Sequence, residues 1–67
     1  MKVKDIKQVV ERKPFQPFVV RLTNGAEYEF KEPRDIGATK DYRSVFHFGN
    51  SGWDLIDTDS IVEISVR

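Results

Sequence analysis

The sequence predicts a mainly β domain with one N-terminal α-helix and a five-stranded, bent antiparallel sheet. Three observations carry this prediction: helical periodicity confined to residues 3–12, short alternating apolar stretches between residues 18 and 66, and turn residues that separate those stretches. A chain of 67 residues is long enough for one hydrophobic core. Residues 1–67 are therefore predicted to form a single domain.

Residues 3–12 are predicted to form an amphipathic helix. Their apolar side chains recur at three- and four-residue spacing: Val3, Ile6, Val9 and Val10. Pro14 disfavours helical geometry at the preceding residue, so the helix should stop at Lys13. The step Pro14-Phe15-Gln16-Pro17 should then form a stiff connector, with Phe15 tucked under the helix.

Two alternating stretches, residues 18–22 and 26–30, flank Thr23-Asn24-Gly25 and predict a β-hairpin. A two-residue turn would place Leu22 opposite Glu27, whereas a three-residue loop keeps one face of the hairpin apolar. We therefore expect Gly25 in the left-handed conformation. The expected cross-strand pairs are Leu22 with Ala26, Val20 with Tyr28, and Phe18 with Phe30.

The rest of the chain is expected to complete the sheet. Residues 31–35 contain Pro33 and should bend or break the sheet before a short strand at residues 36–39. The third, fourth and fifth substantial strands are predicted at residues 44–48, 53–56 and 61–66, joined by turns at residues 49–52 and 57–60, and the short, weak strand at residues 36–39 is not counted among the five. The apolar content of residues 44–48 predicts a strand covered on both sides. In the last strand, Val62, Ile64 and Val66 are expected to point inward.

Composition narrows the classes of protein that the chain can belong to. Eleven basic and eleven acidic residues cancel, which removes the overall positive field that most nucleic-acid-binding proteins use. The chain has no cysteine, so stability must come from packing or from self-association. No apolar run suits a signal peptide or a transmembrane helix, so a cytoplasmic protein is expected, with no membrane partner.

Charge is nevertheless distributed unevenly along the sequence. Residues 1–13 hold five basic and two acidic side chains, a net of three positive charges. Residues 54–63 hold four acidic and no basic side chains, a net of four negative charges. Solvated faces and helix-dipole complementarity explain such clusters in many small domains. The alternative is head-to-tail complementarity between copies of the chain.

A small barrel is the economical arrangement for so few residues, with the sheet curled around one apolar face and the helix over an open end. The helix, the segment 18–25, the bent second strand and the short turn at residues 57–60 resemble the SH3-like and Sm-like barrels, including the bacterial Hfq-type proteins. Hfq-type proteins place tyrosine, lysine and histidine at the start of the last strand, where they help bind uridine-rich RNA. Here residues 57–61 read Asp-Thr-Asp-Ser-Ile, so this RNA pocket is not carried over.

A second resemblance rests on the Pro-Phe-x-Pro-Phe step at residues 14–18 and on Asn24-Gly25. Both are similar to features of small bacterial proteins of unknown function that have an N-terminal helix and an Asn/Asp-Gly hairpin. Those proteins often carry a His-Pro pair after the second strand, where this chain has Glu32-Pro33. The resemblance implies an architecture and brings no activity or residue roles.

Enzymatic and metal-dependent chemistry is not expected, and no catalytic, metal-binding or cofactor-binding residue is predicted. His47 is the only histidine and has no cysteine or second histidine to complete a metal site, so a structural role is expected for it. No serine lies in a nucleophile-elbow pattern. The acidic stretch at residues 54–59 lacks the spacing and the terminal glutamate of a calcium-binding EF-hand loop, so turn and cap roles are expected.

Four side chains are the candidate partner surface: Lys40, Tyr42, Arg43 and Trp53. Tyrosine, tryptophan and arginine dominate protein interfaces, and the same aromatic rings could stack bases while the cations contact phosphate. Tyr42 is expected to be exposed, whereas Trp53 could instead belong to the core, because a small domain needs its largest ring for packing. Neutral net charge favours a protein partner.

The last strand is a candidate edge for self-association, with Ile61 and Glu63 as its marker residues. Sm-like proteins assemble rings through such edges, and exposure of Val19 and Ile61 would add an apolar patch for the neighbour. The sequence therefore predicts a non-enzymatic module that binds a protein or itself. Single-stranded RNA binding is the alternative.

Overall fold

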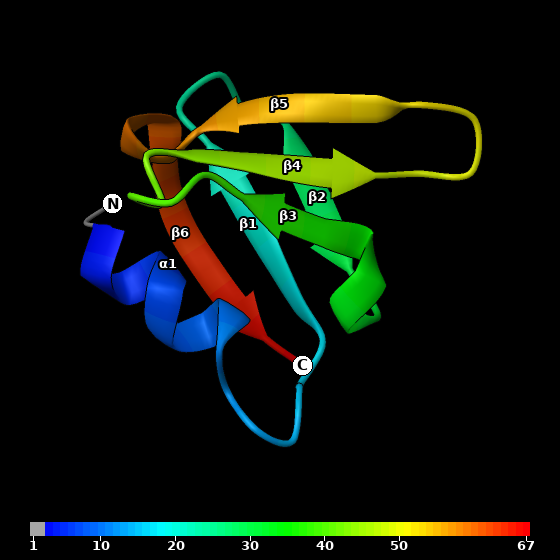
Figure 1. The fold of residues 1–67 in the computed structure, drawn as a ribbon. Coiled ribbons are helices and arrows are strands. Elements are labelled where there is room, and N and C mark those ends of the chain that lie inside the picture. Colours follow the sequence, from blue (N-terminus) through cyan, green and yellow to red (C-terminus); the bar gives the residue numbers. More distant parts are fainter. Residues whose placement is uncertain (1–2) are drawn as a thin grey trace.

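The prediction of a mainly β chain with one N-terminal helix is confirmed by a computed structural model that describes residues 3–67 (Figure 1). Six strands form two three-stranded antiparallel sheets, in the orders β2-β1-β6 and β3-β4-β5. The elements, in chain order, are α1 (Val3–Val10), β1 (Phe18–Leu22), β2 (Glu27–Phe30), the 3₁₀ turn η1 (Pro33–Asp35), β3 (Ile36–Ala38), β4 (Ser44–Phe48), β5 (Trp53–Asp57), the 3₁₀ turn η2 (Thr58–Ser60) and β6 (Ile61–Val66).

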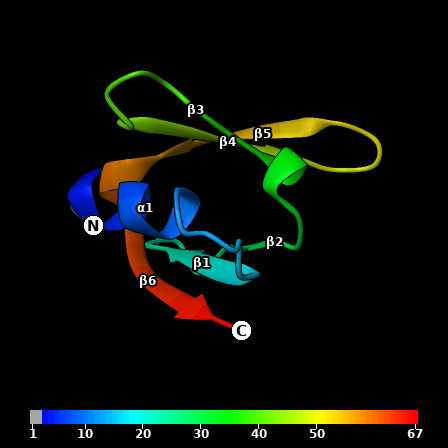
Figure 2. The ribbon, with the colours of Figure 1, turned by 60° about the horizontal axis from the view of Figure 1, so that its bottom comes forward.

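The two sheets form two layers, and α1 lies along one side of them (Figure 2). The core fills the space between the layers and draws buried side chains from both sheets and from the helix: Ile6, Phe18, Val20, Phe30, Val45, Ile56 and Ile61. Five substantial strands in one curled sheet were expected, but η1 separates β2 from β3, and β3, predicted only as a short, weak strand, is a full member of the second sheet. Pro33 at the start of η1 has no N–H to donate to a strand ladder, so the chain leaves one sheet there and begins the other.

Helix α1 ends two residues earlier than the sequence predicts. It ends at Val10, and the Glu11 amide still donates to the Lys7 carbonyl at 2.9 Å. Ile6 is fully buried on the inner face of the helix. Phe15 is half-buried against the core, with its ring centroid 5.9 Å from that of Phe18, so the connector packs on the domain as expected.

The hairpin between β1 and β2 has the predicted loop and register. Gly25 has a φ of 88°, and the Leu22 amide donates to the Ala26 carbonyl at 2.8 Å. Val20 pairs with Tyr28 and Phe18 pairs with Phe30. The requirement that one face be apolar therefore selected the correct turn.

Strand β4 differs from the prediction that it is covered on both sides. Its inner face is buried at Val45, which pairs with the equally buried Ile56 of β5. Its outer face carries Phe46 and Phe48, and 44% of Phe48 is exposed. No element between residues 3 and 67 packs over this outer face, so its apolar content does not reflect a second core.

Strand β6 contains a bulge that changes which of its side chains point inward. Leu22 of β1 pairs with Ile61, but the preceding residue of β1, Arg21, pairs with Glu63, so Val62 is left without a partner. The bulge lets Ile61 and Ile64 both face the core, although they are three residues apart. The expected inward position of Val62 is wrong: this side chain is 51% exposed. Val66 is also largely exposed at the strand end.

Candidate functional site

The predicted partner surface is divided between the two ends of sheet β3-β4-β5. Lys40 and Arg43 are exposed in the turn before β4, whereas Trp53 begins β5 opposite Phe48, the last residue of β4. The four-residue rise of strand β4 separates these ends by about 13 Å. Trp53 and the cations of the turn therefore do not form one continuous site.

Tyr42 is not exposed as expected. It is half-buried against the core, and its hydroxyl donates to Glu11 Oε2 at 2.9 Å. Its φ of 59° lies in the left-handed region, and its carbonyl accepts a 2.6 Å hydrogen bond from the hydroxyl of buried Thr58. The Lys7 ammonium lies 6.0 Å from the ring centroid. Tyr42 thus joins the β3–β4 turn to α1 and to η2.

The hydrogen bond to Glu11 raises the pKa of the Tyr42 phenol above its ordinary value, and the nearby Glu11 charge adds to the effect. Because the folded-state pKa is raised, this contribution to stability is complete below the ordinary pKa of about 10 and is lost as pH rises through the folded-state pKa. We expect Glu11→Gln to lower the pKa of Tyr42, as followed by phenolate absorbance. The difference between the unmodified chain and Tyr42→Phe identifies the part of the phenolate absorbance that comes from Tyr42. An unchanged Tyr42 titration in Glu11→Gln would exclude the hydrogen bond between Tyr42 and Glu11.

The turn that carries Lys40 and Arg43 is organised by Asp41. Its carboxylate accepts hydrogen bonds from the Arg43 amide at 3.1 Å and the Thr39 hydroxyl at 2.8 Å, and these contacts lower the pKa of Asp41. The Arg43 guanidinium also lies 3.7 Å from this carboxylate. Part of the positive charge in the turn is therefore balanced locally.

The most unusual surface is the outer face of sheet β3-β4-β5, which we call the aromatic face. It consists of five residues: Gly37, Phe46, Phe48, Trp53 and Leu55. Trp53 is 62% exposed, Leu55 59% and Phe48 44%, so Trp53 is a surface residue and not part of the core. The rings of Phe46 and Phe48 are nearly parallel at a centroid distance of 6.1 Å, and Phe46 lies 5.7 Å from Trp53.

Strand register explains how this face forms. Phe46 pairs with Gly37 on one side and with Leu55 on the other, while Phe48 pairs with Trp53. A Cβ at Gly37 would lie 3.1 Å from the Phe48 ring, so glycine allows that ring to lie close to β3. The sequence could have predicted this face. Side chains alternate between the two faces of a strand, and residues that pair across a hairpin lie on the same face, so the spacing of these residues around the turn at 49–52 places them together.

Strand β6, predicted from the sequence as a candidate edge, is a terminal strand of its sheet, and its two marker residues differ in environment. Strands β2 and β6 are the terminal strands of one sheet, and β3 and β5 are those of the other. Ile61 is buried, whereas Glu63 is exposed and receives the Arg21 Nε–H at 3.2 Å. The predicted outer patch of Val19 and Ile61 is wrong, because both side chains are buried. Val62, displaced by the bulge, and Val66, at the strand end, are the exposed apolar residues of this edge.

His47 links the two sheets. Its Nε2 lies 3.1 Å from the Glu29 carbonyl oxygen of β2, and its Nδ1 lies 3.4 Å from Asp54 Oδ2. The ring also packs against Tyr28 and, edge-on, against Phe30. Within residues 3–67, no three histidine, cysteine or acidic side chains are grouped so that they could hold a metal ion.

The acidic corner at residues 57–60 has the expected cap chemistry: Asp57 Oδ1 accepts a hydrogen bond from the Asp59 amide at 3.0 Å.

Among the described residues, no helix is long and apolar enough to cross a membrane. Comparison with protein-family models found no matching family, and comparisons with curated proteins and with solved structures found no match either.

Proposed function

We propose that the chain is a non-enzymatic module that self-associates through the aromatic face and the open edge of β5 beside it. The observation that carries this proposal is the exposure of Phe48, Trp53 and Leu55 on one side of a single sheet. Large apolar side chains grouped in this way mark interaction surfaces, and tryptophan is prominent among interface hot spots. Burying them would add the apolar contact that a 67-residue core lacks.

A second copy of the chain offers a suitable strand for the β5 edge. Pairing β5 with another β5 would bring Asp54 and Asp57 of both copies together, which like-charge repulsion opposes. Strand β6 is better suited, because its one acidic residue, Glu63, is already paired with Arg21, and Val62 adds exposed apolar surface. Head-to-tail pairing of β5 with β6 would generate a ring or a filament. The sequence resemblance to ring-forming Sm-like proteins supports the same arrangement.

Light scattering across a concentration series tests this proposal. The chain should reach a mass that is a multiple of its 7.8 kDa protomer. Leu55→Lys and Val62→Lys should each return it to the protomer mass, because each places a charge at the paired edges. Gln8→Lys is the matched control, since it adds the same charge to an exposed residue of α1. A protomer mass at high concentration, or assembly that survives Leu55→Lys, would contradict the proposal.

Exposed Trp53 makes single-stranded RNA the second candidate ligand, because nucleobases stack on such rings. The charges favour protein instead: Asp54 is next to Trp53 in the chain, whereas Lys40 and Arg43 lie at the far end of the sheet. Titration with mixed single-stranded RNA separates the two. Binding that falls steeply with salt and weakens in Trp53→Ala would favour RNA over self-association as the use of the aromatic face.

A further inference from the structure

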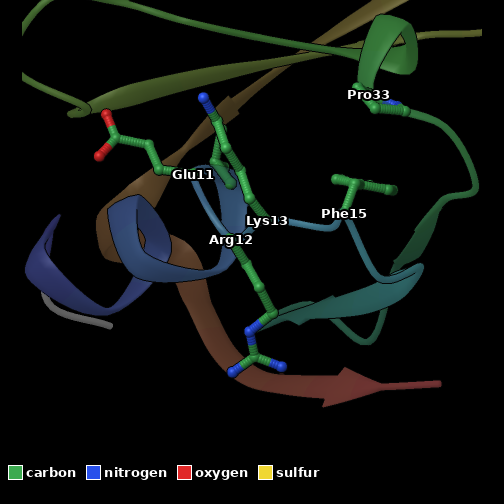
Figure 3. A pocket seen from close by; sticks show the side chains of 6 residues that line it. Glu11, Arg12, Lys13, Phe15 and Pro33 are labelled. Atoms are coloured by element: carbon green, nitrogen blue, oxygen red, sulfur yellow. The ribbon is translucent and has the colours of Figure 1, made fainter.

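A cleft of about 520 Å³ lies between the chain that follows α1 and the turn η1 (Figure 3). It is lined by Val10, Glu11, Arg12, Lys13, Phe15 and Pro33. None of these residues belongs to the aromatic face or to the β5 and β6 edges. The volume falls in the range of small-molecule sites, about 300–1,000 Å³.

The apolar part of the lining suits a hydrophobic ligand body. Val10 and Phe15 are half-buried against the core, which fixes their positions, and Pro33 provides a rigid apolar ring from η1. Among the lining residues, Pro33 has no amide N–H, and the Glu11 amide already donates to the Lys7 carbonyl. Neither position can therefore donate a backbone hydrogen bond to a ligand phosphate group.

The lining holds one carboxylate and two cations, which differ in their contacts and directions. The Glu11 carboxylate accepts the Tyr42 hydroxyl, and Arg12 donates to Gln16 Oε1 at 2.8 Å. In Figure 3 the Arg12 side chain points in the opposite direction from that of Lys13. No ion pair formed within residues 3–67 involves the Lys13 ammonium. Lysine offers a compact point charge, and one such charge balances one monovalent anionic group but only part of the charge of a phosphate dianion.

We infer that this cleft binds a small carboxylate with an apolar body, which lies against Phe15 and Pro33 while its carboxylate pairs with the Lys13 ammonium. The cleft size favours a small molecule, and the side chains of Phe15 and Pro33 favour an apolar ligand body. The Lys13 ammonium, which has no ion-pair partner within residues 3–67, favours a negative charge on the ligand. This site is separate from the proposed assembly surface. A variant such as Leu55→Lys should therefore lose assembly and keep ligand binding.

Titration with hexanoate and with its neutral counterpart hexanamide tests the inference, with backbone amide chemical shifts measured by NMR. Hexanoate should shift the amides of residues 10–13, Phe15 and Arg34, and should bind about two- to fivefold more tightly than hexanamide, the difference expected from one partly exposed ion pair. Lys13→Met should remove this preference for the carboxylate and leave hexanamide binding unchanged, because methionine keeps the apolar stem of the side chain.

Lys4→Met is the matched control, because Lys4 is an exposed lysine of α1 outside the cleft. It should retain the preference for hexanoate. Three results would each overturn the inference. The unmodified chain could bind hexanoate and hexanamide with equal affinity, the chemical-shift changes could be confined to the aromatic face, or Lys13→Met could keep the full preference for hexanoate.

Discussion

Ile6→Ala is expected to destabilise the domain by about 2–5 kcal/mol, the cost of removing a fully buried isoleucine and leaving a cavity. Ile6 is completely buried and joins α1 to core residues of both sheets. A chain of this length is expected to have a total stability of about 3–10 kcal/mol. The substitution should therefore leave a large unfolded fraction, measured as the free energy of unfolding in urea by circular dichroism.

The controls separate loss of packing from a change in helix propensity. Gln8→Ala removes an exposed side chain from the same helix and should change the free energy of unfolding by less than about 0.5 kcal/mol. Ile6→Val should cost about 0.5–1.5 kcal/mol, because it removes one methylene group. Equal stability of Ile6→Ala and Gln8→Ala would show that the helix is not docked through Ile6.

Thr58→Val is expected to destabilise the domain by about 1–3 kcal/mol, the cost of leaving a buried polar group without its partner. Thr58 is 1% exposed, and its hydroxyl donates to the Tyr42 carbonyl at 2.6 Å. Valine has nearly the same shape but no donor. Because the same bond holds the turn that presents Tyr42 to Glu11, the pKa of Tyr42 should also fall toward its ordinary value.

Thr58→Ser distinguishes the hydrogen bond from the packing of the Thr58 methyl group. It keeps the hydroxyl and should cost about 0.8 kcal/mol for the lost methyl group. Its Tyr42 titration should match that of the unmodified chain. A valine variant as stable as the unmodified chain, with an unshifted Tyr42 titration, would mean that this hydrogen bond does not organise the turn.

Local rules were sufficient where one short segment determines the outcome. The three-residue loop at Gly25 followed from parity and from the conformational freedom of glycine, and the structure has that loop. The Asp57 cap followed from turn chemistry. The aromatic face could have been predicted in the same way, because Phe46, Phe48, Trp53 and Leu55 have matching parity around one turn. The aromatic face was not predicted, because β4 was expected to be covered on both sides.

Other features depend on contacts between distant segments. The position of Tyr42 is set by Glu11, which is 31 residues away in the sequence. The bulge at Val62 depends on the register of β6 against β1, so strict alternation within β6 placed Val62 on the wrong face. The cleft beside Lys13 also requires tertiary structure, since η1 brings Pro33 toward the connector. No periodicity within one segment indicates these arrangements.

Quenching of Trp53 fluorescence by acrylamide, measured across the concentration range in which the mass changes, tests the proposed interface most directly. Trp53 is the only tryptophan of the chain and is 62% exposed in the protomer, so its signal reports on the aromatic face alone. If the aromatic face is the interface, the quenching constant should fall as the mass rises, and it should stay high in Leu55→Lys. A quenching constant that stays high while the mass rises would show that copies associate through another surface.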